Sequence, residues 1–183
     1  MVVSDAPVLV TERLELRLPT KEDISAMWAI VTDPATARFL APSASPADHF
    51  QRFCRNAGSW LLYGYAGFML RERASGELVG NAGMFHSVRG LGTDFDDTPE
   101  AGWILRADRT GQGLAREAMD AALDWFERQH GQTRIVCMIS PGNAPSIRLA
   151  ERLGFEPMRE AVLPDGDAVR LFERLPGSGR RLG

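Results

Sequence analysis

The sequence is short of cysteine, of long apolar runs and of excess charge of either sign. Its two cysteines, Cys54 and Cys137, belong to no Cys-x-x-Cys pair or Cys/His cluster, which disfavours a disulfide framework or a zinc site. The longest apolar stretch, WLLYGYAGFML at 60–70, is about half as long as a membrane-spanning helix and contains two glycines. With 21 basic and 24 acidic residues the net charge is −3, which gives no electrostatic case for nucleic acid. We therefore expect no metal, no membrane and no nucleic-acid partner.

The chain has the length and composition of one globular domain. Its 183 residues are 44% apolar and 25% charged, enough to bury a substantial core. The opening residues MVVSDAPVLV lack the basic segment of a signal peptide, so we expect a cytoplasmic protein. With no internal repeat and no linker, we expect a single domain over residues 9–175 and a flexible tail over 176–183, PGSGRRLG.

Periodicity and turn residues predict an alternation of strands and helices. A period of two, or a short β-branched run, predicts strands at 13–18, 65–73, 77–86, 100–107, 133–140, 155–160 and 168–175. Helical spacing with capping residues predicts helices at 20–32, at 45 to about 57, at 113–130 and at 143–154. The order β-α-α-β-β-β-α-β-α-β-β indicates an α/β (α+β) domain: a mixed, mostly antiparallel sheet with helices on both faces.

The stretch LRADRTGQGLAREA at 105–118 places two glycines between a strand and a helix. Free backbone N–H groups at a helix start, together with the helix dipole, bind anions, and Gly111 and Gly113 would let a diphosphate approach them. No Gly-Lys-Ser/Thr follows, so this is not a P-loop, and Arg116 stands where a dinucleotide fingerprint needs glycine. On the residues alone, the glycines indicate either a phosphate site or merely a tight turn against the sheet.

Three segments together carry a family resemblance. EAGWILRADRTGQGLAREA, the later GNAPSIRLAERLGF and the opening TERLELRLPTKED resemble, in this order and spacing, the GNAT superfamily of acyl-CoA-dependent N-acetyltransferases. The opening is similar to the branch of ribosomal-protein N-terminal (alanine/serine) acetyltransferases. The resemblance implies a V-shaped sheet, split between its fourth and fifth strands as numbered from residue 13, with acetyl-CoA as cosubstrate in the split.

The same resemblance implies which residues bind the cofactor. The family's diphosphate motif falls on TGQGLA, with threonine where the family has Arg or Gln, and the next residue, Arg116, is either a phosphate ligand or a surface ion-pair residue. The strand that pairs with the pantetheine arm falls on WIL. Asn143 matches an asparagine that contacts pantetheine, with a plain helix cap as the alternative. The implied cofactor-binding residues are Trp103, Ile104, Leu105, Thr110, Gly111, Gln112, Gly113, Leu114, Ala115, Arg116, Asn143 and Ser146.

Amide formation needs a neutral amine, a donor for the oxyanion and a proton for the leaving thiolate. The resemblance implies an oxyanion donor in the strand backbone near Leu105. Many family members use a tyrosine as the acid at a position that is Ala150 here, and Ser146 is the candidate replacement, unless its hydroxyl bonds within the helix. Glu100 matches a carboxylate that accepts the amine proton, or it is an ordinary strand-edge charge.

The acceptor and the assembly stay open at this point. The acceptor is an amine, either a protein N-terminus or a small molecule, and the acidic loop with Asp94, Asp96 and Asp97 slightly favours a cationic one. A catalytically inactive acyl-CoA sensor is the alternative outside enzymes. A dinucleotide-dependent oxidoreductase is disfavoured by Arg116 and by the lack of a βαβ pattern downstream. A homodimer is a weak expectation.

Overall fold

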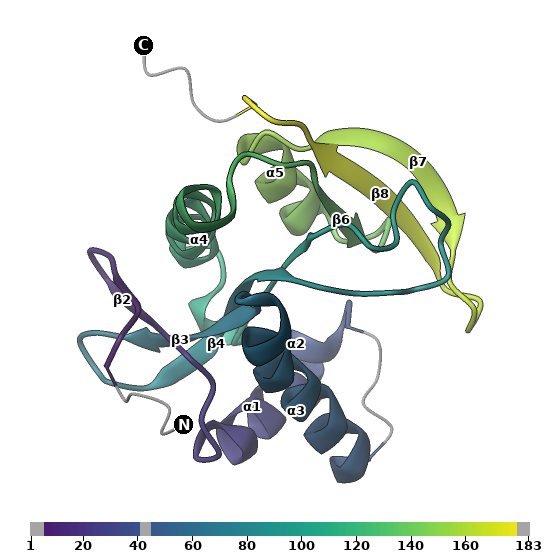
Figure 1. Cartoon of the computed structure of the whole chain (residues 1–183). Helices are drawn as coiled ribbons and strands as arrows, with labels where there is room; N and C mark the ends of the chain where they lie inside the picture. The colour runs from purple at the N-terminus through teal and green to yellow at the C-terminus, as the bar shows by residue number, and fades with distance from the viewer. Residues whose placement is uncertain (1–5, 41–44, 179–183) are drawn as a thin grey trace.

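The computed structural model describes residues 6–40 and 45–178 (Figure 1). Its helices are α1 (Asp23–Thr32), α2 (Pro34–Ala37), α3 (Pro46–Tyr63), α4 (Leu114–His130) and α5 (Ala144–Arg152), with a 3₁₀ turn η1 (Ala107–Arg109). Its strands are β1 (Leu9–Val10), β2 (Leu14–Arg17), β3 (Gly67–Glu72), β4 (Leu78–Phe85), β5 (Glu100–Leu105), β6 (Ile135–Ile139), β7 (Glu156–Val162) and β8 (Ala168–Arg174).

The eight strands form one sheet in the order β1-β2-β3-β4-β5-β6-β8-β7. Every neighbouring pair is antiparallel except β5 and β6, which are parallel. The β5–β6 connection carries α4, as a parallel crossover requires. The sheet is therefore mixed and mostly antiparallel, as predicted.

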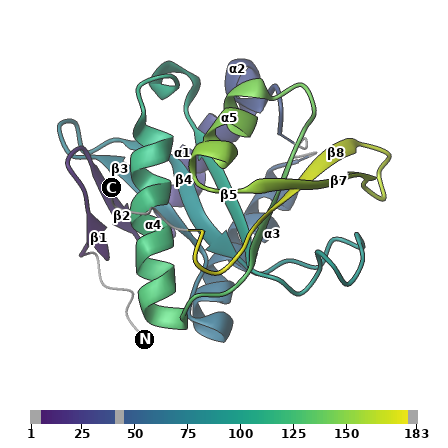
Figure 2. The same cartoon turned by 90° about the horizontal axis from the view of Figure 1, so that it is seen from above.

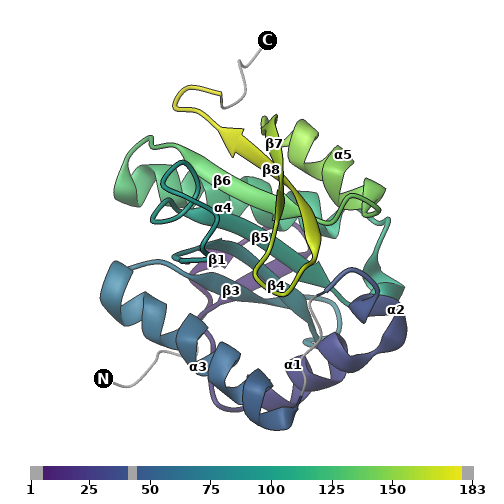
Figure 3. The same ribbon diagram turned by 90° about the vertical axis from the view of Figure 1, so that its right-hand side faces the viewer.

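Helices cover both faces of the sheet (Figures 2 and 3). In β3, Phe68 and Leu70 face the core cluster that contains α4 and α5 residues, whereas Met69 between them packs with Met27 and Ile30 of α1. This alternation is the period of two of a strand buried on both sides. The prediction of helices on both faces is confirmed.

The second helix is longer than predicted. α3 continues beyond residue 57 to Tyr63 and ends at Gly64, which has φ +75°. The sequence predicts an end near Ala57, but the helix continues through Gly58, where a side chain would meet nothing within 4 Å. The Asn56 amide also holds the helix to the sheet, since it donates to the Gly67 carbonyl and accepts from the Gly67 N–H.

Three short elements were not predicted: β1, α2 and η1. Each has four residues or fewer, which is too short for a periodic pattern. At the other end of the chain, residues 176–178 form a turn in which the Ser178 N–H donates to Leu175 O at 3.1 Å. The remainder of the predicted flexible tail, 179–183, lies outside the described residues.

Two absences hold for the described part of the chain. Across residues 6–40 and 45–178, no helix combines the length and apolarity needed to cross a bilayer. The same residues contain no cluster of three or more His, Cys, Asp or Glu side chains able to hold a metal ion.

Candidate functional site

The sheet opens between β5 and β6. These strands pair only where they begin, at Glu100 and Val136, with the Val136 N–H donating to Pro99 O at 2.9 Å. In contrast, β4 and β5 stay paired from Phe85 opposite Glu100 to Gly80 opposite Leu105. Beyond Ala101, one edge of β5 therefore has no partner strand among the described residues, and we call the region beside this unpaired edge the split.

Backbone alternation decides which groups of β5 face the split. The Arg106 N–H donates to Val79 O at 2.8 Å, and a Cβ placed on Gly80 would lie 2.0 Å from the Ile104 carbonyl oxygen. Residues 104 and 106 thus turn their backbone groups toward β4. Since successive residues of a strand alternate, Trp103 and Leu105 turn theirs toward the split. This arrangement offers a strand-like edge to an extended ligand.

The glycine turn at 111–113 lies beyond the end of β5 at which β6 is not paired with it. Gly111 and Gly113 have φ +75° and +81°, a region that favours glycine, and Gly113 is the N-cap of α4 with no side-chain cap. Among the described residues, no protein group accepts a hydrogen bond from the backbone N–H groups of 111–116. A side chain at Gly111 would meet nothing within 4 Å, so conformation rather than crowding requires glycine there.

The side chains of the other predicted residues in this segment bond within the turn, pack in the core or lie at the surface. The Thr110 hydroxyl donates to Ala107 O at 2.8 Å, and the Gln112 amide donates to Asp108 O at 3.0 Å. Leu114 is buried in the main core, with Ala115 beside it at the helix start. Arg116 lies 3.5 Å from Asp120, which is the surface ion-pair arrangement named as its alternative.

The start of α5 approaches the same split. The Asn143 side chain accepts from the Ser146 N–H at 3.2 Å, so the predicted helix cap is present, and within residues 6–40 and 45–178 its amide N–H₂ has no acceptor. The Trp103 indole N–H donates to the Ser146 hydroxyl oxygen at 3.2 Å. Trp103 and Ser146, both predicted in the site, are thus in direct contact, whereas Ala150 is fully buried in the core.

Glu100 lies at the closed end of the split and is already paired. Glu100 is 2% exposed, and its carboxylate accepts from Nε and Nη2 of Arg89 at 2.6 and 2.7 Å. The Ser87 hydroxyl donates to the same carboxylate. Sequence reasoning missed Arg89, and the ion pair gives Glu100 a structural partner in the loop after β4.

Cys137, on β6, lies next to Glu100. Burial raises the pKa of the Cys137 thiol far above its usual range, and the charge of Glu100 raises it further. A thiol held in the neutral form is a poor nucleophile, so a covalent acyl carrier is not supported at this position.

Two of the three carboxylates of the acidic loop, those of Asp94 and Asp96, are held by hydrogen bonds. Asp94 pairs with Arg159 at 2.8 Å, and Asp96 accepts from the N–H groups of Arg89, Leu91 and Gly92. These contacts hold the pKa of both carboxyls below the usual range, chiefly the Arg159 hydrogen bond for Asp94 and the Arg89 backbone N–H for Asp96. Asp94 and Asp96 are therefore already paired, whereas Asp97 is exposed and lies 3.4 Å from His86.

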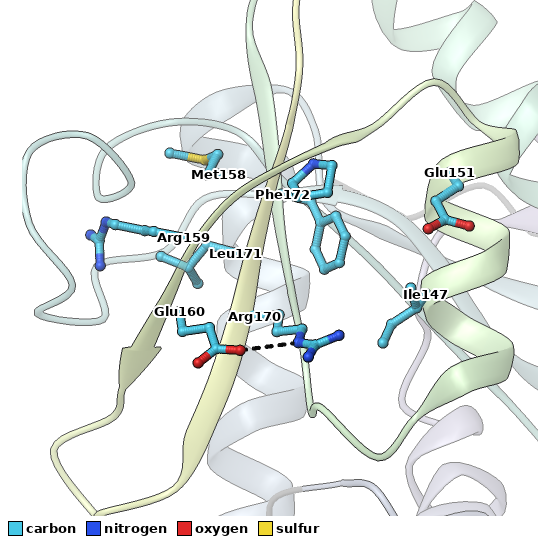
Figure 4. Close-up of a pocket in the computed structure, with 9 residues that line it drawn as sticks. Ile147, Glu151, Met158, Arg159, Glu160, Arg170, Leu171 and Phe172 are labelled. Carbon is cyan, nitrogen blue, oxygen red and sulfur yellow. Dashed lines mark hydrogen bonds and ion pairs between the residues drawn. The ribbon is translucent and has the colours of Figure 1, made fainter.

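A separate pocket of about 280 Å³ lies between α5 and the β7–β8 hairpin (Figure 4). None of the predicted site residues lines it. Its ion pair, Arg170 to Glu160 at 3.4 Å, lies on the hairpin. The lining residues are Ile147, Glu151, Pro157, Met158, Arg159, Glu160, Arg170, Leu171 and Phe172.

Comparisons with known proteins agree with this geometry. Residues 13–156 match the family model described as "Acetyltransferase (GNAT) domain". A solved structure assigned to the GNAT acetyltransferase family, from Bordetella pertussis, is 36% identical, with 91% of this chain and 98% of that chain covered and a TM-score of 0.81. An uncharacterized N-acetyltransferase, p20, from Bacillus licheniformis is 26% identical over 88% of each chain.

The branch suggested by the opening segment also has a structural neighbour. The ribosomal-protein-S5-alanine acetyltransferase from Vibrio fischeri has a TM-score of 0.73 at 17% identity, covering 94% of this chain and 98% of that one, which shows a shared fold. The family match spans well over half of the residues and includes the split and the glycine turn. The chain belongs to the GNAT acetyltransferase family.

Proposed function

We propose that this protein transfers an acetyl group from acetyl-CoA to an amine by direct attack in a ternary complex. The observation that carries the proposal is the continuity of the open edge of β5 with the glycine turn at 111–116. The turn offers free N–H groups and a helix dipole to a diphosphate, and the strand edge offers an extended arm its backbone partners. The glycine turn and the strand edge adjoin each other, as the diphosphate and the pantetheine arm do in CoA.

The turn and the strand edge divide the binding of CoA. The N–H groups of 111–116 hold the diphosphate, and Trp103 and Leu105 pair with the pantetheine arm. The arm runs from the turn toward the closed end of the split. The thioester therefore extends past Leu105, and the N–H of Trp103 becomes a second candidate for the oxyanion donor predicted near Leu105.

Ser146 is proposed as the acid that protonates the leaving thiolate. An indole N–H only donates, so the Ser146 hydroxyl is the acceptor in its bond with Trp103 and keeps its own proton for another partner. During transfer the amine nitrogen forms a bond to the carbonyl carbon, the tetrahedral intermediate collapses and the C–S bond breaks. The proton from Ser146 then neutralises the sulfur, Ser146 regains a proton from water, and the proton that the base takes from the amine passes to the solvent.

The amine must lose a proton for the amide to form, and Glu100 stays the predicted base. Its bidentate contact with Arg89 lowers its availability in this arrangement, because the amine would have to displace a guanidinium or act through water. Glu100→Gln therefore tests the role, as described below.

Release of free thiol from acetyl-CoA, measured over a panel of amines, tests the proposed function. The panel comprises peptides with free N-terminal alanine or serine, a polyamine and an aminoglycoside. Amine-dependent thiol release with a matching acetylated product supports the proposal. Binding of acetyl-CoA without turnover on any amine would favour the sensor, the alternative to which the buried Ala150 in the usual tyrosine position points.

A further inference from the structure

Arg13 lies between β1 and β2, about 100 residues before the glycine turn in the sequence, and its side chain contacts this turn. Its Nη1 donates to the Gln112 carbonyl oxygen at 2.8 Å, and its Nε donates to the Glu117 carboxylate at 2.7 Å. A Cβ built on Gly113 would lie 3.5 Å from its Nη2. One guanidinium thus contacts the turn and the first turns of α4 at once.

The bond to Gln112 fixes the orientation of one peptide group. In a trans peptide the C=O and the following N–H point in opposite directions. Because the Gln112 carbonyl points at Arg13, the Gly113 N–H points away from Arg13. Glycines at both ends of this segment make its peptide groups easy to reorient, so a fixed acceptor matters more here than in an ordinary turn.

Arg13 also compensates a charge that would oppose an anion. Glu117 lies near the start of α4, close to where the diphosphate is proposed to bind. Its carboxylate accepts from the Thr11 hydroxyl at 2.6 Å, from the Arg13 N–H at 2.8 Å and from Arg13 Nε. The ion pair at 2.7 Å balances the negative charge beside the anion site.

We propose that Arg13 is a positioning residue for the diphosphate of CoA, acting by aiming the Gly113 N–H and by neutralising Glu117. This inference rests on the proposed function, since it assigns a task at the same turn. It predicts a defect specific to ligands that carry a diphosphate, which a general loosening of the β1–β2 hairpin would not produce.

Equilibrium dissociation constants for acetyl-CoA and for S-acetylpantetheine, which lacks the diphosphate, test the inference. We expect Arg13→Gln to weaken acetyl-CoA about tenfold, the scale of one or two hydrogen bonds with a charged partner, and to leave S-acetylpantetheine unchanged. Adding Glu117→Gln should restore part of the loss, because the uncompensated carboxylate is then gone. Arg13→Lys, which keeps the charge, should lose less than Arg13→Gln and serves if that variant folds poorly.

Arg73→Ala is the matched control. Arg73 donates to the carbonyls of Thr11 and Glu12 in the same hairpin, at 3.0 and 2.9 Å, and has no contact with the turn among the described residues. Equal losses for Arg13→Gln and Arg73→Ala, or equal losses for both ligands, would overturn the inference. Unchanged acetyl-CoA binding by Arg13→Gln, with a wild type that binds tightly, would also overturn the inference. That result would leave the proposed function intact. A folded wild type that binds no acetyl-CoA overturns both.

Discussion

The indole nitrogen of Trp103 and the hydroxyl oxygen of Ser146 lie 3.2 Å apart, which joins β5 to the first turn of α5. Both residues come from segments that the sequence assigns to cofactor binding. Their contact fixes the Ser146 hydroxyl beside the strand edge on which the thioester is proposed to lie. In the proposed mechanism, Trp103 therefore orients the hydroxyl of Ser146.

Removing either partner should slow the departure of the thiolate and leave the affinity for acetyl-CoA nearly unchanged. We expect Ser146→Ala to reduce kcat by about 10²-fold, at the lower end of general-acid effects, with little change in the affinity for acetyl-CoA. Trp103→Phe keeps the aromatic ring and loses only the N–H, so its loss should be about fivefold, the worth of one hydrogen bond. Steady-state thiol release measures both effects.

The double variant distinguishes a shared role from separate ones. If Trp103 acts through Ser146, Trp103→Phe should add little to Ser146→Ala. Donors with a more acidic thiol leaving group should also narrow the gap between each variant and the wild type. Additive losses that do not depend on the leaving group would contradict the assignment of Ser146 as acid.

Glu100 and Arg89 form an ion pair between a buried carboxylate and a partly exposed guanidinium, and disrupting it should reduce stability. We expect Glu100→Gln to lower the free energy of unfolding by about 1.5 kcal/mol, because the neutral amide loses the charge-assisted hydrogen bonds from Arg89 while the guanidinium keeps access to water. Urea unfolding measures this directly, and Arg89→Met is the matched variant that breaks the pair from the other side.

Kinetics of the folded fraction then decide whether Glu100 is also the base. A base predicts that Glu100→Gln lowers kcat of the folded enzyme by about 10²-fold, whereas Arg89→Met, which keeps the carboxylate, does not. If both variants keep the wild-type kcat and differ only in stability, Glu100 serves the ion pair alone.

Glu117 should make stability depend on acid pH. Burial opposes its ionisation, but the hydrogen bonds from Thr11 and Arg13 outweigh burial and leave the pKa of this carboxyl below its usual range. A carboxyl whose pKa is lower in the folded state stabilises the fold above its unfolded pKa, about 4.3, and loses that contribution as the pH falls through the folded value. Glu117→Gln should therefore be less stable than the wild type at pH 7, and the difference should shrink below about pH 4. Thermal melts from pH 7 to pH 3 check this, and a constant difference would contradict it.

The two cysteines should differ sharply toward alkylating reagents. Cys54 is exposed on α3, whereas Cys137 is buried and its pKa is raised by burial and by Glu100. We expect one thiol to react in the folded protein and both to react in denaturant. Cys54→Ser should abolish the native reaction, and fast labelling of Cys137 in that variant would contradict the assigned burial.

Local sequence patterns predicted those parts of the site that are built from residues close together in the sequence. The glycine turn at 111–113, the Asn143 cap and the strand beginning at Glu100 each follow from residues that are contiguous or a turn apart, and the structure contains all three. Adding the family resemblance gave the split between two parallel strands, which no periodicity reveals.

The side-chain pairs that organise the site were not predictable in the same way. Trp103–Ser146 and Arg13–Glu117 are separated by 43 and 104 positions, so the contacts exist only once the sheet and helices have assembled. Glu100–Arg89 spans 11 positions, but the intervening acidic loop hides the pairing. From the sequence alone, Glu100 cannot be distinguished as an exposed charge at a strand edge or as a buried carboxylate in an ion pair.

Calorimetric titration of acetyl-CoA tests the central claim most directly, with Gly111→Trp as the probe and Gly131→Trp as its control. Both glycines have positive φ, +75° and +80°, and a Cβ at either would meet nothing within 4 Å, so both variants require a side chain at a positive φ without a clash at the Cβ, at opposite ends of α4. We predict that the wild type and Gly131→Trp bind acetyl-CoA and that Gly111→Trp does not. Equal binding by all three proteins, or none by a folded wild type, would contradict a cofactor diphosphate at this turn.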